Sequence, residues 1–285
     1  MKTRYAVASA LLIGTAGWVG ACTPQPPLPC PIQTANPYFG LPGFATFYTL
    51  KSGTGACAMK EYEVYGFQKY NVPGTTETHV AVRPGDLGGH YENGRSDPAD
   101  PEGEHINAIG DLPEEPGSDK LCAITFEDEH AHHAEQDFEA IPDENLADGG
   151  VVPGEPALSI KYEWTDLKFI VSAAVPGSAF MGELKYTEDG CTATYSAEGF
   201  WPEVACDPTA HIPASGDPDL PDGGMLEDLD CAAGQDVANG HTLGSGINPD
   251  FPVVCDPNFG VCVLGKRDRA TRAITRVSVN ELTKL

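Results

Sequence analysis

The segment Glu127–Asp137 concentrates side chains that could bind a metal ion. It holds His130, His132 and His133 among five acidic residues, and imidazole and carboxylate groups are common ligands of zinc and copper. His130 and His133 would share a face of a helix, whereas His130 and His132 would share a face of a strand. The spacing matches neither H-E-x-x-H nor H-x-H-x-D-H. We therefore expect a solvated acidic loop that binds zinc only adventitiously, with a zinc or copper site as the alternative.

A second acidic run, Asp217–Asp230, could bind calcium. Asp217, Asp219 and Asp222 supply hard oxygen ligands, which Ca²⁺ prefers, and glycines follow them. An EF-hand loop has acids at relative positions 1, 3 and 5, whereas these fall at 1, 3 and 6 with prolines between them. We expect an acidic loop bounded by a disulfide, with calcium binding as the alternative.

The sequence contains no recognisable catalytic motif. Gly244-Ser245-Gly246 lacks the G-x-S-x-G pattern of a serine hydrolase. There is also no C-x-x-C-H for haem and no glycine-rich phosphate loop. In an exported chain the cysteines are expected to be oxidised, which disfavours a thiolate nucleophile. We expect no enzymatic activity and no resident cofactor, and a hydrolase is the least favoured alternative.

The chain has nine cysteines, an odd number. If Cys22 is modified, eight are left, and an even set in an exported chain predicts four disulfides. The eight are Cys30, Cys57, Cys122, Cys191, Cys206, Cys231, Cys255 and Cys262. Eight cysteines allow 105 pairings. Two local pairs are the simplest: Cys255 with Cys262 across a hairpin, and Cys206 with Cys231 around the acidic run.

The N-terminus explains why Cys22 would be modified. Lys2 and Arg4 precede an apolar stretch from Tyr5 to Val19, which is too short for a membrane span but typical of a signal peptide. It ends in Val19-Gly20-Ala21-Cys22, which resembles the lipobox of bacterial lipoproteins. The alternative is an ordinary signal peptide cleaved near Ala21, with Cys22 in a disulfide.

The resemblance to lipoproteins implies acyl chains, palmitate among them, on Cys22 after removal of residues 1–21. Several acyl chains together anchor a protein stably to a membrane. Lipoproteins held in the inner membrane tend to carry Asp directly after the cysteine, whereas this chain has Thr23. The resemblance therefore implies an outer-membrane lipoprotein, on the periplasmic or the surface face.

The chain is strongly acidic, with a net charge of −25. This charge disfavours binding to nucleic acid and direct docking on anionic lipid. Residues 266–285 are basic by contrast, with six cations and two acids. We expect them to form a solvated tail or a short terminal helix; the alternative is a tail that folds back on the acidic body or meets an anionic surface.

Alternating apolar residues predict a mainly β fold. Strands are expected at Phe44–Leu50, Tyr62–Tyr70, Thr78–Arg83, Leu121–Phe126, Ser159–Thr165, Leu167–Val175, Phe180–Thr187 and Cys191–Ala197. The last four follow one another through short turns such as Asp189-Gly190, which predicts an antiparallel meander or sandwich-like sheet. Phe251–Cys255 and Val261–Leu264 predict a closing hairpin. The turn-rich residues 84–119 predict a long loop, in which Ile106–Ile109 could form a short element.

These elements divide the chain into a signal peptide (1–21), a Pro-rich tether (22–43), a β-rich domain (44–265) with long Pro/Gly/Asp-rich loops, and a basic C-terminal tail (266–285). The lipobox together with Phe47–Gly53, Tyr186–Tyr195 and Gly244–Pro252 resembles myxobacterial lipoproteins. That resemblance assigns no activity. We expect a lipid-anchored envelope protein with a binding or structural role toward a protein or a glycan, and a metal-binding envelope lipoprotein is the alternative.

Overall fold

The computed structural model describes most of the chain from Cys30 onward. The described residues are 30–35, 42–71, 73–75, 77–126, 133–145, 150–207, 211–213, 225–235, 243–268 and 273–285. The signal peptide, Cys22 and most of the tether lie outside them. The helices within the described part of the chain are all too short or too polar to cross a bilayer.

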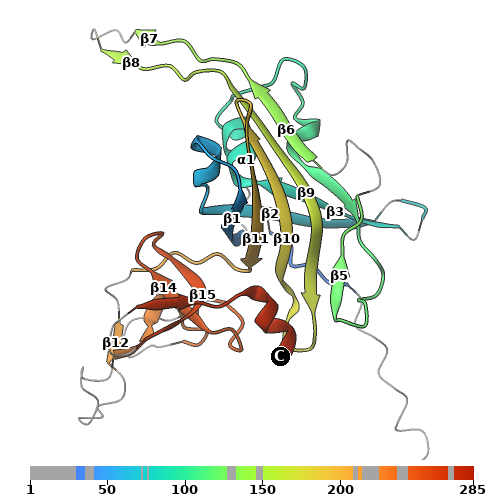
Figure 1. Ribbon diagram of the computed structural model, residues 1–285, viewed down its shortest axis with the longest axis vertical. Helices are drawn as coiled ribbons and strands as arrows, with labels where there is room; N and C mark the ends of the chain where they lie inside the picture. Colours follow the sequence, from blue (N-terminus) through green and yellow to red (C-terminus); the bar gives the residue numbers. More distant parts are fainter. Residues whose placement is uncertain are drawn as a thin grey trace, which may run out of the picture.

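One antiparallel sheet of nine strands forms the body of the protein. The strands are β1 (Phe44–Ser52), β2 (Tyr62–Asn71), β3 (Thr78–Pro84), β4 (Ala108–Asp111), β5 (Leu121–Ala123), β6 (His133–Phe138), β9 (Leu158–Val171), β10 (Pro176–Glu188) and β11 (Cys191–Phe200). They are ordered β4-β3-β2-β1-β11-β10-β9-β5, and β6 also pairs with β9. In Figure 1, β1, β11, β10 and β9 lie side by side along the long axis, and β2 and β3 cross behind them.

The sheet rolls up until its two edges meet. Asp111, at the end of β4, exchanges backbone hydrogen bonds of 2.8 and 3.0 Å with Thr125. The neighbouring Ile124 donates its N–H to the carbonyl of Leu167 in β9, at 2.8 Å. The short segment after β5 therefore connects β4 to β9, so that little sheet edge is left exposed there. The expected class, mainly antiparallel β with disulfides, is confirmed.

Aromatic side chains fill the interior of the rolled sheet. The ring centroid of Phe67 on β2 lies 4.9 Å from those of Phe44 and Phe180, and 5.0 Å from that of Phe169. All four rings are fully buried. Burying one such side chain stabilises the fold by roughly 1.5–3 kcal/mol, and edge-to-face ring contacts add to this. The interior is therefore a packed core.

Strand β9 is continuous where two strands, Ser159–Thr165 and Leu167–Val175, were expected. Asp166 has a φ of 56°, and the pairing of β9 with β10 shifts register there, which marks a β-bulge. The side chains buried in the interior of the sheet are Ile160, Tyr162 and Trp164 before the bulge and Leu167, Phe169 and Val171 after it. Because the bulge reverses which positions face inward, the sequence pattern looks like a strand boundary.

The segment 84–119 contains more structure than the expected long loop with one short element at Ile106–Ile109. It contains helix α1 (Gly85–Glu92), the 3-10 helix η3 (Glu104–Ile106) and strand β4. Three of the eight residues of α1 are glycine, and glycine has low helix propensity. The helix is held from outside itself: Leu87 is fully buried, and the N–H of Asp86 donates to the Glu63 carboxylate at 2.8 Å.

The described residues beyond Pro202 form a smaller C-terminal lobe at the lower end of the sheet (Figure 1). Its elements are β12 (His211–Pro213), β13 (Met225–Asp228), β14 (Val253–Asp256), β15 (Val261–Arg267), β16 (Ile274–Arg276), and the 3-10 helices η4 (Leu229–Cys231) and η6 (Val279–Lys284). Val279 and Leu282 are buried in a second core, which also contains Ile170 and Phe200 of the main sheet. The basic residues 266–285 thus include a packed terminal helix.

Four disulfides join the described cysteines: Cys30–Cys122, Cys57–Cys191, Cys206–Cys255 and Cys231–Cys262. The two local pairs suggested by the sequence, Cys255 with Cys262 and Cys206 with Cys231, are wrong. Cys255 and Cys262 do lie opposite each other on β14 and β15. Residues 204–206 run along this hairpin, since the N–H of Cys262 donates to the Val204 carbonyl at 2.9 Å. Cys206, at the end of this segment, bonds to Cys255, and Cys262 bonds to Cys231 at the end of η4.

A two-stranded ribbon, which we call the arm, extends from the ends of β6 and β9. It comprises residues 139–157, of which 139–145 and 150–157 are described, and contains β7 (Glu144–Asn145) and β8 (Val151–Val152). Figure 1 shows it projecting from the upper end of the sheet, at the opposite end of the long axis from the C-terminal lobe.

Candidate binding cleft between the sheet and the C-terminal lobe

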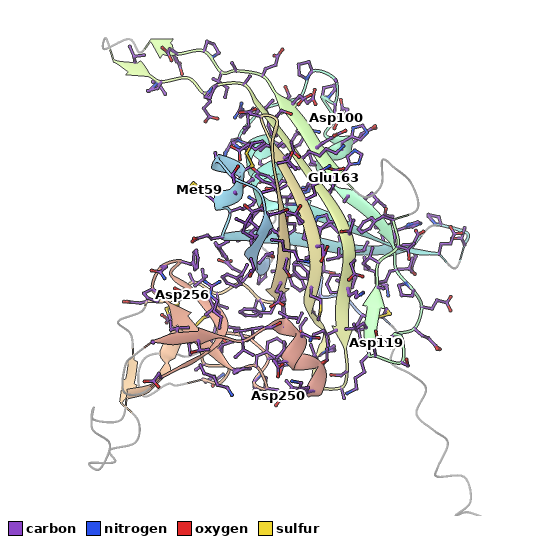
Figure 2. All side chains as sticks on the ribbon, in the orientation of Figure 1. Met59, Asp100, Asp119, Glu163, Asp250 and Asp256 are labelled. Atoms are coloured by element: carbon purple, nitrogen blue, oxygen red, sulfur yellow. A yellow bond between two sulfur atoms is a disulfide. The ribbon has the colours of Figure 1, made fainter. Side chains whose placement is uncertain are left out.

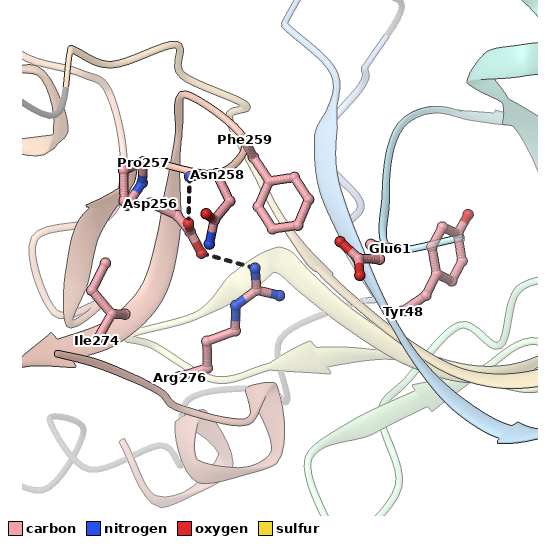
Figure 3. Close-up of a pocket in the computed structure, with 8 residues that line it drawn as sticks. All are labelled: Tyr48, Glu61, Asp256, Pro257, Asn258, Phe259, Ile274 and Arg276. Atoms are coloured by element: carbon pink, nitrogen blue, oxygen red, sulfur yellow. Dashed lines mark hydrogen bonds and ion pairs between the residues drawn. The ribbon is translucent and has the colours of Figure 1, made fainter. Parts of the chain in front are cut away.

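An open cleft of about 560 Å³ lies where the C-terminal lobe meets strand β1 (Figure 3). We call it the junction cleft. Its lining residues are Tyr48, Glu61, Asp256, Pro257, Asn258, Phe259, Ile274 and Arg276. The volume falls within the range of ligand-binding pockets. The turn between β14 and β15 supplies one wall together with β16, and the chain around β1 supplies the other.

Arg276 is the fixed cation of the cleft. Its Nη2 lies 2.9 Å from Oδ2 of the buried Asp256, whose Oδ1 accepts the backbone N–H of Asn258 at 2.9 Å. The guanidinium also lies over two rings, 4.7 Å from the centroid of Phe47 and 5.0 Å from that of Phe259. Such stacking and pairing orient the planar group, and 39% of the Arg276 side chain is still exposed to solvent.

Three aromatic rings hold the C-terminal lobe against the sheet. Phe259 from the β14–β15 turn lies 6.0 Å from Phe47 on β1 and 5.6 Å from Tyr62 on β2, measured between centroids. The Tyr62 hydroxyl donates to Glu203 at 3.1 Å. Burial, together with the Glu203 carboxylate, raises the pKa of Tyr62, so the phenol stays protonated and keeps donating. The wall carried by the lobe is therefore fixed relative to the sheet.

Glu61 faces Phe259 and Arg276 from the other side of the cleft (Figure 3). It immediately precedes β2 and is exposed. The cleft thus presents a carboxylate on one wall, a guanidinium on the other, and partly exposed apolar groups of Phe259 and Ile274 between them. This combination can bind a polar chain that carries apolar groups.

A charged cluster lies on the inner side of β1, behind the cleft, with the side chains of Lys60 and Glu63 largely buried and that of Asp86 partly exposed. The ammonium of Lys60 lies 2.9 Å from Oε2 of Glu63 and 2.6 Å from Oδ2 of Asp86. The hydroxyl of Tyr48, a cleft residue, lies 2.8 Å from Glu63, and that of Tyr162 lies 3.1 Å from it. These hydrogen bonds connect β1, β2, β9 and helix α1, so the cluster braces the strand that forms one wall of the cleft.

The charges of this cluster shift one another's titration. Burial raises the pKa of Glu63, and the adjacent Lys60 ammonium opposes this only in part. Burial alone would lower the pKa of Lys60, but the carboxylates of Glu63 and Asp86 outweigh it, so that the pKa is raised. Lys60 therefore remains a cation throughout the physiological range.

The metal ligands expected from the sequence are mostly not placed. His130, His132, Asp217, Asp219 and Asp222 lie outside the described residues, as does the lipidation site Cys22. His133 is described and buried: it lies on β6, with Nε2 3.1 Å from Oε1 of Glu135. Burial would raise the pKa of Glu135, but Lys161 and His133 beside it lower the pKa overall. The zinc and calcium hypotheses stay predictions.

The cysteines form one sulfur-rich site. The Sγ atoms of Cys206, Cys231 and Cys262 lie within 4.8 Å of one another, because the two disulfides of the C-terminal lobe pack side by side. Thiolates are zinc ligands, but Cys231 is bonded to Cys262 and Cys206 to Cys255, so this site is structural.

The main residues of the junction cleft were not identified from the sequence. The turn Asp256-Pro257-Asn258-Phe259-Gly260 was expected between two strands, and the Asp-x-Asn spacing is typical of a side-chain-capped turn. No local pattern relates this turn to Arg276 or to Glu61. These residues meet only because β16 pairs with β15 and the lobe packs on β1.

Comparison with known proteins defines the class of the molecule as a lipoprotein similar to those of myxobacteria. The chain belongs to the MlpA family, whose model matches residues 42–202, more than half of its length. One relative, from Myxococcus xanthus, is named "Putative lipoprotein MlpA". It is 28% identical over 204 residues, which cover 71% of this chain and 68% of that protein. No solved structure matches. The family match spans the rolled sheet and ends before the C-terminal lobe.

Proposed function

We propose that this chain is an outer-membrane lipoprotein, anchored by acyl chains on Cys22, with a binding or structural role in the cell envelope. The lipobox and the similarity to a named lipoprotein support the anchor. The junction cleft carries the binding role, because Arg276 and Phe259 are held in place by neighbouring groups, and Arg276 and Glu61 face solvent.

The chemistry of the cleft favours recognition over catalysis. Arg276 is oriented by Asp256 and by the rings of Phe47 and Phe259, and a guanidinium fixed in this way is suited to binding. Arginine and aromatic residues are enriched at protein–protein contacts and carry much of their binding energy. Strand β16 is also the edge strand of its small sheet, and an extended chain can pair with such an edge. A polypeptide segment is therefore the ligand we favour, with a glycan as the alternative.

The anchor is tested by cell fractionation with palmitate labelling. We expect Cys22→Ser to abolish labelling and to release the protein from the membrane fraction. Thr23→Asp is the matched variant, because it leaves the lipidated cysteine intact and should move the protein to the inner membrane. A Cys22→Ser protein that still fractionates with the outer membrane would contradict the anchor.

The cleft is tested with a photo-cross-linking residue at Asn258, an exposed position of the cleft. We expect ultraviolet light to link the protein to a polypeptide on intact cells, and we expect Phe259→Ala to reduce that product. The same residue at Glu77, exposed just before β3, is the control. Equal products from both positions, insensitive to Phe259→Ala, would remove the binding role from the cleft. A product that glycosidases remove would make the partner a glycan.

A further inference from the structure

Residues 53–61 connect β1 to β2, and we call them the strap. Their 3-10 helix η2 (Ala56–Met59) packs against β1, β10 and β11. Most strap residues are exposed, and Met59, which is 78% exposed, lies at the periphery of the molecule (Figure 2). The Tyr195 hydroxyl accepts the backbone N–H of Lys60 at 3.1 Å. The strap is therefore a surface segment that is fixed to the sheet near its end.

The ammonium of Lys60, near the end of the strap, lies among three tyrosine rings, which we call the tyrosine cage. Its Nζ lies 4.9, 5.3 and 5.7 Å from the ring centroids of Tyr186, Tyr162 and Tyr48, respectively. An aromatic ring attracts a cation over its face within about 6 Å. The Lys60 side chain is 10% exposed. Aromatic cages of this kind bind organic ammonium groups, so Lys60 itself indicates which ligand chemistry the cage accepts.

The walls of the cage belong to the body of the protein and not to the strap. The three tyrosines lie on β1, β9 and β10, and the two carboxylates that contact the ammonium, Glu63 and Asp86, come from β2 and α1. The Tyr162 hydroxyl lies 3.1 Å from Glu63 and 3.2 Å from Asp86. Because these bonds do not involve Lys60, they hold the walls in position when it leaves. The Asp86 side chain is 46% exposed, which opens the site to solvent on that side.

The charge around the cage favours a cationic ligand. Glu63 and Asp86 bring two carboxylates to one ammonium, so the site keeps a negative charge even with Lys60 in place. Residues 42–202, which contain the rolled sheet, have 29 acidic and nine basic side chains. Such an excess of negative charge concentrates cations near the surface. A ligand with one or more ammonium groups therefore matches both the cage and its surroundings.

The Cys57–Cys191 disulfide joins the strap to the start of β11. Cys191 is partly exposed, so a thiolate from solvent can reach its sulfur. Exchange with an external dithiol would break the bond between the two sulfurs, pass two electrons and two protons to them, and leave a disulfide in the dithiol. Gly53 and Gly55, with φ of 126° and 91°, would then let the strap turn away, because glycine adopts many backbone conformations. The disulfide thus determines whether Lys60 can leave the cage.

We propose that the tyrosine cage is a binding site for a primary alkylammonium group, which Lys60 occupies as a built-in ligand while the Cys57–Cys191 bond is intact. Reduction of that bond frees the strap and admits an external ammonium group, either from a small diamine or from a lysine side chain of another polypeptide. A primary ammonium on an unbranched chain fits best, because the Lys60 side chain has that form. This site goes beyond the binding role of the junction cleft, although Tyr48 contributes to both.

The first test is isothermal titration calorimetry of the full-length lipoprotein in a mild non-ionic detergent with 1,5-diaminopentane. The variant Cys57→Ser with Cys191→Ser leaves the strap free and should bind the diamine. The oxidised wild type should bind at least about tenfold more weakly, because the tethered Lys60 competes at a high effective concentration. The uncharged 1,5-pentanediol, which has the same carbon chain, should bind neither protein. Equal affinities of the two proteins for the diamine would overturn the inference.

Substitutions in the cage show where the diamine binds. In the paired-serine variant, Tyr186→Leu should weaken binding about tenfold, because a ring that faces the cation is lost. Tyr186→Phe is the matched control: it keeps the ring, loses the hydroxyl that donates to Glu188, and should bind as its parent does. Binding that Tyr186→Leu leaves unchanged would place the diamine elsewhere on the acidic surface and contradict the assignment to the cage.

A measurement on the wild type does not depend on how well the serine variant folds. The protein is equilibrated with reduced and oxidised dithiothreitol at graded ratios, and free cysteines are alkylated and located by mass spectrometry. A ligand that binds only the open state shifts the equilibrium toward that state, so diaminopentane should raise the reduced fraction of Cys57–Cys191. The fully buried Cys30–Cys122 bond is the control and should not respond. If the diamine leaves the reduction of Cys57–Cys191 unchanged, the inference fails.

An N-acetylated peptide with a single lysine, titrated beside the diamine, distinguishes the two sources of the ammonium group. Tighter binding of the peptide assigns the cage to a lysine side chain of a partner polypeptide, and tighter binding of the diamine assigns it to a free amine. If neither ligand binds the paired-serine variant, the cage is not a ligand site. The junction cleft is tested separately by the cross-link at Asn258, so either proposal can fail alone.

Discussion

The ammonium of Lys60 and the carboxylate of Glu63 form a buried ion pair, 2.9 Å apart, just inside the sheet. Three tyrosines surround the cation, with ring centroids 4.9 to 5.7 Å from Nζ. Such an arrangement compensates for the loss of hydration with hydrogen bonds and ring contacts. Removing one member therefore leaves the other charge buried with fewer partners.

We expect Lys60→Met to lower the free energy of unfolding by about 3–5 kcal/mol, because it leaves the Glu63 charge uncompensated. The double variant Lys60→Met with Glu63→Gln should recover part of this loss. Urea denaturation at neutral pH measures both. The control is Lys51→Met, which breaks the exposed pair with Glu183 and should cost less than about 1 kcal/mol. Equal losses from Lys60→Met and Lys51→Met would contradict a buried charge cluster.

Asp100 should make the fold sensitive to acid. Burial alone would raise its pKa, but N–H groups of His105 and Glu104, each at 2.8 Å, hold the pKa below its ordinary value of 3.8. Near these pKa values the folded state binds fewer protons than the unfolded state. The stabilisation by Asp100 is therefore complete above pH 3.8, the pKa of the unfolded state, and is lost as the pH falls through the lower pKa of the folded state. Figure 2 shows Asp100 beside the upper part of the sheet.

The comparison of wild type with Asp100→Asn isolates this contribution. At neutral pH the variant should be about 1–3 kcal/mol less stable, because the charge-assisted hydrogen bonds are weakened. The difference should shrink as the pH is lowered below about 4. Thermal unfolding of both proteins from pH 7 to pH 3 measures this, and a difference that stays constant would show that the carboxylate charge plays no part.

The disulfides should differ in their effect on stability according to the length of chain they close. Cys57–Cys191 spans 134 residues and Cys231–Cys262 spans 31. From chain entropy we expect the free energy of unfolding to fall by about 5 kcal/mol when Cys57 and Cys191 are both replaced by serine. For Cys231 and Cys262 we expect a fall of about 3.7 kcal/mol. Chemical denaturation of the two paired-serine variants tests the order. A larger loss for the shorter span would indicate that the C-terminal lobe depends on its disulfides for more than chain entropy.

Arg95→Met should loosen the arm. We expect faster hydrogen exchange at the amides of Ile141 and Glu155, which pair across its base. The reason is that the variant loses the hydrogen bonds from the Arg95 guanidinium to the carbonyls of Glu139 and Pro156, one on each strand of the arm. Mass spectrometry of the exchanged protein localises the effect. Arg83→Met, which removes the hydrogen bond from β3 to Asn107, should leave those amides protected. Unchanged exchange in Arg95→Met would mean that backbone pairing alone orders the arm.

Metal analysis tests the hypothesis for the histidine-rich segment. We expect protein purified without an affinity tag to contain less than one zinc or calcium ion per chain, because His133 is buried and held by Glu135. Stoichiometric zinc that disappears in His130→Ala with His132→Ala would contradict this expectation. His133→Ala then shows whether the buried ring takes part.

Local patterns in the sequence predicted the strands well and their assembly poorly. The hairpin of β10 and β11 follows from alternating side chains on both sides of Asp189-Gly190, where φ is positive at both turn residues. The bulge at Asp166 was missed because it reverses the alternation within one strand. The cysteine pairs, Arg276 beside Phe259, and Arg95 beneath the arm all depend on contacts between distant segments, and no local periodicity encodes those.

The Cys30–Cys122 disulfide determines how the body would respond to mechanical load from a membrane anchor. Tension along the segment that precedes Cys30 would pass through the sulfur bridge to Cys122. Cys122 lies on β5 and pairs with Phe169 on β9. The load would therefore reach β9, which is bonded to β10 on one side and to β5 and β6 on the other. Because the bridge takes up the tension at Cys30, little of it would reach the start of β1, where Phe44 pairs with Tyr65 and Ala45 with Phe200. An anchored molecule should therefore withstand pulling at its N-terminus.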